Sequence, residues 1–430
     1  MARHYFSRAG PALLGIGDRY RAVFAERNVA LLLAAGVISE LGDWFNTVAL
    51  IALAYGFGEG ALGVGGMFAV RMLMRLFLQG PAGTFVDRHA GRPLLFASQL
   101  IMAVIASAFA LLVVVPALWL LYLLVILLEA TNCIARPAFM VELKTEAPVE
   151  QRAVANGALF ATMTTAQMVG PLLGALVLGA SGAAAVFALN GLTFLGVAVA
   201  VSQLRGGLRA SRRVEILPSD ADPLDNRERE AAVVGYSWLL RRRDLGLYML
   251  VCLSLALLAQ ATITLFVVRA LTFALDDGGV GLFYAAVGVG SVTGGIVAGA
   301  REEHAAPLFP AAIAMGICAI ALAVFGVAGS VLLSVIALII AGFATDFYEV
   351  IGLTFFQGAI PDAVYARFFS VFLLALSAGG LVGAVAGPVL ERVLGVGMSL
   401  VILALPSLVL ASALGAMSKN WRHAGWNRGH

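Results

Sequence analysis

Residues 93–115 read PLLFASQLIMAVIASAFALLVVV and contain no charged side chain. About 20 apolar residues in a helix cross the hydrocarbon core of a bilayer, so this stretch predicts a membrane-spanning helix. Working outward in both directions gives twelve such stretches: about 29–56, 62–84, 93–115, 117–140, 153–180, 183–204, 245–271, 279–300, 306–328, 331–358, 367–390 and 396–417. The pattern therefore predicts an all-α membrane protein with twelve transmembrane helices.

The composition excludes a soluble globule. Of the 430 residues, 61% are hydrophobic and only 12% are charged, whereas a soluble domain carries about 25% charged residues. The three cysteines lie inside apolar runs without metal-ligand spacing, and we interpret them as packing residues. No cofactor or metal site is expected.

The basic residues orient the chain. With both termini in the cytoplasm, 24 of the 28 lysines and arginines fall on the cytoplasmic side, as the positive-inside rule requires. The first 27 residues are polar and show no signal peptide. We expect an integral protein of the bacterial cytoplasmic membrane, organised as follows: a cytoplasmic N-terminal segment (1–28), an N-terminal six-helix half (29–204), a cytoplasmic linker (205–244), a C-terminal six-helix half (245–417) and a cytoplasmic tail (418–430). The linker sequence AAVVGYSWLLRRR (231–243) predicts an amphipathic helix on the inner membrane face.

Landmarks recur at a shift of 216 residues. Val64-Gly65 falls on Val280-Gly281, and Gly170-Pro171 falls within one residue of Gly387-Pro388. The offset is close to half the chain, so two pseudo-repeated six-helix halves in the same orientation are expected.

The segment after the second predicted span reads GTFVDRHAGR (83–92). Its Gly83, Asp87, Arg88 and Arg92 resemble the loop signature of the major facilitator superfamily. The resemblance implies a charge latch that changes with conformation, in which Gly83 lets two helices approach closely. A basic turn that only fixes the topology is the alternative.

Span five carries a glycine-proline pattern at Gly170, Pro171 and Gly174, preceded by Gly157 and Ala166. This pattern is similar to the signature of the antiporter branch of that superfamily, although two of its glycines are alanine here. Pro171 is expected to bend the helix, and the small residues to allow close packing.

Ala135-Arg136-Pro137-Ala138, followed by Glu142, resembles the drug and siderophore exporter group of the same superfamily. The resemblance covers nearly the whole chain and implies a secondary transporter.

Charged residues inside the spans are costly and therefore informative, at about 2.5–3.5 kcal/mol each at the bilayer centre. Glu40 and Asp43 share one face of span one, and Arg71 and Arg75 share one face of span two. We predict a carboxylate–arginine network between these two helices, either structural or used in coupling.

The superfamily resemblance implies that helices one, four, seven and ten line a central cavity. In these helices stand Glu129, Gln260, Asp346 and Glu349. Glu129, Asp346 and Glu349 have no evident basic partner in the sequence, although pairing with Arg136 or with each other would give them a purely structural role. Desolvation favours the protonated form of a carboxylate, which suits proton exchange near neutral pH.

These features predict a proton-coupled exporter of lipophilic or cationic small molecules that works by alternating access in the lipid bilayer, as a monomer. One alternative is a transporter of a lipid, an anionic metabolite or a siderophore held by Arg71 and Arg75. Another is a receptor or scaffold with a transporter fold, whose output would be the 205–244 linker. The sequence contains no nucleophile, metal or Walker-loop pattern, so neither an enzyme nor a nucleic-acid partner is expected.

Overall fold

The computed structural model describes residues 21, 23–89, 91–148, 151–205, 243–275, 278–299, 308–359 and 362–423. In these ranges all regular secondary structure is helical, without a strand. The helices are α2 (Arg27–Gly56), α3 (Ala61–His89), α4 (Arg92–Ala108), α5 (Leu111–Val114), α6 (Leu118–Glu146), α7 (Arg152–Ser202), α9 (Arg243–Thr264), α10 (Phe266–Thr272), α11 (Gly278–Gly299), α12 (Leu308–Val327), α13 (Val331–Ala359) and α14 (Asp362–His423). The predicted amphipathic helix in the linker lies outside the described residues, apart from Arg243 at its end.

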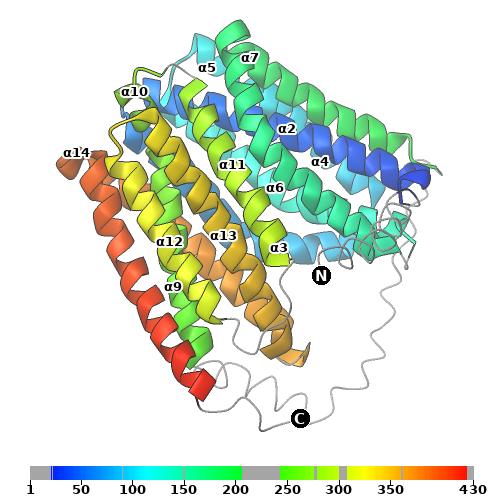
Figure 1. The fold of residues 1–430 in the computed structure, drawn as a ribbon. Coiled ribbons are helices and arrows are strands. Elements are labelled where there is room, and N and C mark those ends of the chain that lie inside the picture. The colour runs from blue at the N-terminus through cyan, green and yellow to red at the C-terminus, as the bar shows by residue number, and fades with distance from the viewer. Residues whose placement is uncertain are drawn as a thin grey trace, which may run out of the picture.

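Ten helices in the described part of the chain are long and apolar enough to cross a membrane. Two of them, α7 and α14, contain 51 and 62 residues and are each broken by one glycine. Gly182 has φ 75° and ψ 171°, and Gly395 has φ 72° and ψ 167°, a region that residues with a Cβ rarely adopt. Figure 1 shows both helices folding back on themselves. The same break therefore recurs 213 residues apart (395 minus 182), near the offset of the sequence repeat.

Two predicted spans are interrupted in the structure. Span 93–115 is divided between α4 and α5, because the chain tightens into turn-type hydrogen bonds at Phe109 and Ala110. Span 245–271 is divided between α9 and α10 at Leu265. The hydroxyls of Thr262 and Thr264 donate to the carbonyls of Leu258 and Ala261, and such bonding back to the preceding turn bends helices. The predicted tail is also helical at first, since α14 continues to His423.

The bundle has two ends, which we name by their residues. The linker end contains Arg27, Arg92, Glu146 and Gln203, and the far end contains the Gly182 and Gly395 breaks. At the linker end, Arg27 donates to the carbonyl of Gln203 at 3.2 Å and Asn28 donates to Glu146 at 2.5 Å. These bonds tie the start of α2 to the ends of α6 and α7.

Helices α2–α7 form the N-half and helices α9–α14 the C-half. The two halves meet in a pseudo-symmetric pair of contacts toward the far end. A Cβ at Gly65 of α3 would meet Ala384 and Pro388 of α14, and a Cβ at Gly281 of α11 would meet Pro171 and Leu172 of α7. Four landmarks of the sequence repeat thus lie at the contact between the halves, namely Gly65, Pro171, Gly281 and Pro388. In Figure 1 the two groups of helices diverge toward the linker end.

One exposed ion pair also joins the halves at the far end. Arg392 lies 3.1 Å from the carboxylate of Glu59, and both side chains are more than half exposed. Because exposed ion pairs contribute little, we expect Glu59→Gln to lower the free energy of unfolding by less than about 1 kcal/mol. Chemical denaturation in detergent would measure this, and a larger loss would mean that Glu59 has a further role.

Candidate functional site

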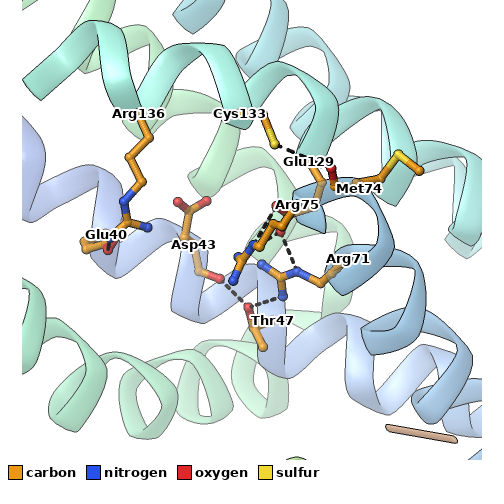
Figure 2. A network of polar contacts seen from close by, with 9 residues as sticks. All are labelled: Glu40, Asp43, Thr47, Arg71, Met74, Arg75, Glu129, Cys133 and Arg136. Atoms are coloured by element: carbon orange, nitrogen blue, oxygen red, sulfur yellow. Dashed lines mark hydrogen bonds and ion pairs between the residues drawn. The ribbon is translucent and has the colours of Figure 1, made fainter. Parts of the chain in front are cut away.

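A group of charged side chains lies inside the N-half, between α2, α3 and α6 (Figure 2). The Nε atom of Arg71 lies 2.7 Å from a carboxylate oxygen of Glu129, and Nη2 of Arg75 lies 3.2 Å from the same oxygen. The two arginines are one helical turn apart on α3, so they share one face. Glu129 is only 4% exposed, whereas Arg75 is 37% exposed. One buried carboxylate therefore holds two guanidinium groups.

This pairing corrects the sequence-based prediction, in which Arg71 and Arg75 neutralise Glu40 and Asp43 while Glu129 lacks a partner. The structure pairs both arginines with Glu129 instead. The reason is that α3 packs extensively against α6 and only lightly against α2.

The acids of α2 have other surroundings. Glu40 lies 3.7 Å from Arg136 of α6, an ion pair in which Arg136 is 47% exposed. The carboxylate of Asp43 forms no hydrogen bond or ion pair with any side chain that the structure describes, and only its carbonyl accepts a bond from Thr47. Thr47 in turn accepts a bond from Arg71 at 3.3 Å. Figure 2 shows the Asp43 carboxylate between Arg136 and the Arg71–Arg75 pair.

The remaining predicted site residues lie in the C-half. Gln260 on α9 is buried, and its Nε2 has no hydrogen-bond partner among the described residues. Asp346 and Glu349 lie on α13, and neither forms an ion pair with a basic residue of the described chain. Asp346 lies toward α11, where a Cβ at Gly295 would be 4.0 Å from the Cβ of Asp346. These residues are not part of the network in Figure 2.

The described residues of the loop motif have different surroundings. A Cβ at Gly83 would meet nothing within 4 Å, so the predicted close helix approach at Gly83 is wrong for this conformation, in which the halves diverge at that end. Arg88 is exposed, and the side chain of Asp87 lies outside the described set. Arg92 is buried inside the N-half, 2.7 Å from Glu142 and 2.5 Å from Glu146. Arg92 therefore fastens α4 to the end of α6.

The glycine-proline pattern lies where α7 packs closely against α2. A Cβ at Gly170 would lie 2.6 Å from the Cβ of Trp44, and one at Gly174 would lie 2.8 Å from the Cα of Phe45. Pro171 stays inside the helix, and the non-helical residue is Gly182 instead. The pattern thus brings two helices together, and the break comes eleven residues later.

Several residues near the site were missed from the sequence. Gln99 is a buried amide of α4 whose Oε1 has no described hydrogen-bond partner, and it stands out as a polar residue in the apolar stretch 93–115. Trp44 and Tyr284 form an edge contact across the two halves, with ring centroids 5.3 Å apart. No sequence signal reveals that pair. All three cysteines are buried, as expected, and no metal-binding group was found among the described residues.

Comparisons with known proteins place this arrangement in a family. The sequence matches the Major Facilitator Superfamily over residues 32–384. No match to the chain was found among curated proteins. Among solved structures, a bacterial homologue of the human lysosomal transporter Spinster, in an inward-facing and unoccupied conformation, is similar at TM-score 0.71 and 14% identity. That comparison covers 94% of this chain and 99% of the other.

Two further transporters share the fold. A mutant of the nucleoside transporter NupG has TM-score 0.66 and 15% identity, covering 90% of this chain and 99% of its own. A mutant of the peptide transporter POT, in complex with sulfate, has TM-score 0.66 and 13% identity, covering 93% and 98%. The family match extends over well more than half of the sequence, and the ten apolar helices agree with it. The chain belongs to the Major Facilitator Superfamily and is an integral membrane protein of the transporter class, not an enzyme.

Proposed function

We propose that this protein is a proton-coupled exporter of lipophilic or cationic small molecules. The observation that carries the proposal is the pair of carboxylates on α13, Asp346 and Glu349, without a described basic partner. An ionisable group inside a membrane bundle is costly and is by default a functional candidate. The two carboxylates of α13 would also attract a cationic substrate.

The direction in which Glu349 points supports this role. Leu332, Ile336 and Ile340 form an exposed apolar stripe along α13, which suits contact with lipid. Glu349 is also exposed, but it lies nine residues after Ile340, about two and a half turns further on. Its carboxylate therefore projects from the side of α13 opposite Ile340. An exposed acid on the side opposite this stripe fits a water-accessible cavity.

Glu349→Gln is expected to reduce export to the background level of cells without the protein, because the amide keeps the shape but cannot take up or release a proton. The measurement is accumulation of a fluorescent lipophilic cation in cells that express wild type or variant, with and without a protonophore. Asp346→Asn is the companion variant, and Glu59→Gln is the matched control for loss of a carboxylate elsewhere. Protonophore-sensitive export that persists in both α13 variants would exclude the proposal.

The proposal includes the number of membrane crossings and the orientation of the chain. Each limb of α7 and α14 crosses the membrane once, which gives twelve crossings, with both termini and the linker end in the cytoplasm and the protein acting as a monomer in a bacterial cytoplasmic membrane. With this orientation, the contacts between the halves toward the far end make the conformation inward-facing.

One observation favours a second candidate, a transporter of a lipid, an anionic metabolite or a siderophore. Arg71 and Arg75 share one carboxylate, and Arg75 keeps 37% of its side chain exposed. This group carries one positive charge in excess. If it holds an anion, Arg75→Ala should weaken binding of an anionic substrate about tenfold. Equilibrium binding to the purified protein would measure this, and an unchanged affinity would leave the arginines a structural role.

A further inference from the structure

A pocket lies within the N-half rather than between the halves. It is enclosed by α2, α4, α6 and both limbs of α7, and its volume is about 570 Å³ including the part open to solvent. We propose that this pocket binds a monovalent organic cation, a protonated amine attached to an apolar body. The inference rests on the proposed function and deepens it, because it places the transported cation here and leaves the α13 carboxylates to the proton.

The lining of the pocket offers a protonated amine one carboxylate that has no ion-pair partner. Its lining includes the carboxylates of Glu40 and Asp43 and one guanidinium, that of Arg136. Arg136 is 3.7 Å from Glu40, while the Asp43 carboxylate is unpaired among the described side chains. The arginines behind Asp43 are hydrogen-bonded to Glu129. Within the lining, the Asp43 carboxylate is therefore the acid without an ion-pair partner, and the group of Arg71, Arg75 and Glu129 behind it carries one positive charge in excess.

Gln99 provides an independent observation. It lines the pocket, is 6% exposed, and its Oε1 has no hydrogen-bond partner among the described groups. A buried acceptor without a donor is unfavourable, so a ligand that donates a hydrogen bond to Oε1 would remove this cost. Asn132 and Ser39 add two more polar side chains to the same lining. An ammonium group has the donors that such a lining needs.

The rest of the lining is apolar and adaptable. It is formed mainly by the following side chains: Met102, Met140, Met163, Phe139, Phe194 and Leu159. Methionine thioethers and aromatic rings adapt to varied apolar shapes, and aromatic faces attract cations. A hydrated inorganic ion would gain little from such walls, whereas an amine with an aryl group would bury its apolar body against them.

The test compares two probes on the full-length protein in lipid nanodiscs, with no proton gradient. We expect 4-phenylbutylammonium to bind at least about tenfold more tightly than 4-phenylbutan-1-ol, which has the same apolar body without the charge. Asp43→Asn should weaken binding of the ammonium about tenfold and leave binding of the alcohol unchanged. Gln99→Leu should weaken binding of the ammonium by a smaller factor, and Glu59→Gln should leave its affinity unchanged. Calorimetry measures all of these.

A second readout locates the ligand without a change at Asp43. In Met163→Cys, the ammonium should protect the new thiol from alkylation, since the three native cysteines are buried. Equal affinity of the two probes for wild type would overturn the proposal. So would binding that survives Asp43→Asn but is lost in Glu349→Gln, because this result moves the cation to α13. If ammonium binding depends on Asp43 but cells show no proton-driven export, the cation site in this pocket stands and the proposed function is rejected.

Discussion

Glu129→Gln is expected to destabilise the protein by about 3–5 kcal/mol, because it removes the only carboxylate that pairs with two arginines among the described residues. Glu129 is 4% exposed and Arg71 is 19% exposed. Without the carboxylate, the Arg71 guanidinium would stay largely buried and water could solvate it only in part. The effect should appear as a lower free energy of unfolding in a denaturant titration of the purified protein in micelles. A lower yield of folded protein should accompany it.

Two variants control this result. Glu40→Gln removes an acid from a partly exposed pair at 3.7 Å and should cost less than about 1 kcal/mol. The triple variant Arg71→Met, Arg75→Met, Glu129→Leu removes the charges together and should recover much of the lost stability, because an apolar replacement of a buried ion pair is often neutral. If Glu129→Gln lowers the free energy of unfolding no more than Glu40→Gln does, then the pairing of Arg71 and Arg75 with Glu129 does not stabilise the fold.

The positions of the helices could be predicted from the sequence because they depend on the length of apolar runs, which is a local property. The breaks at Gly182 and Gly395 were also visible, as gaps between the predicted spans. The interruption at Leu265 was not predicted, because it arises from threonine hydroxyls that bond back to the preceding turn. Such bonds compete with the helix without changing the hydropathy of the run.

The candidate site was predicted less well, because it depends on which helices touch. The sequence indicated that Arg71 and Arg75 needed carboxylate partners and pointed to Glu40 and Asp43, and it left Glu129 without a partner. Only the packing of α3 against α6 selects Glu129. The pocket could not be predicted, since its lining comes from four helices whose relative heights no sequence pattern specifies.

Gly290→Leu is expected to prevent correct packing of the C-half, with a loss of more than about 3 kcal/mol, the upper end of the usual cost of overpacking. Here α11 and α13 approach backbone to backbone. A Cβ at Gly290 would meet the carbonyl of Ile339 and the amide of Phe343, and one at Gly342 of α13 would meet the carbonyl of Val287. Neither contact is with a side chain that could rotate away. Membrane helices associate largely through close packing of small residues. A leucine side chain at Gly290 would therefore force α11 and α13 apart.

The matched control is Gly316→Leu on α12, where a Cβ would meet nothing within 4 Å. Both changes replace a helical glycine with leucine, and leucine has the better helix propensity by roughly 0.5–1 kcal/mol. Helix propensity alone therefore predicts that both variants are stabilised. Denaturation of the two purified proteins should instead show Gly316→Leu close to wild type and Gly290→Leu strongly destabilised. Equal stability of the two variants would mean that α11 and α13 are further apart in the membrane than their glycines indicate. Asp346 lies one turn beyond Phe343 on α13, and it would then face α11 across a wider gap.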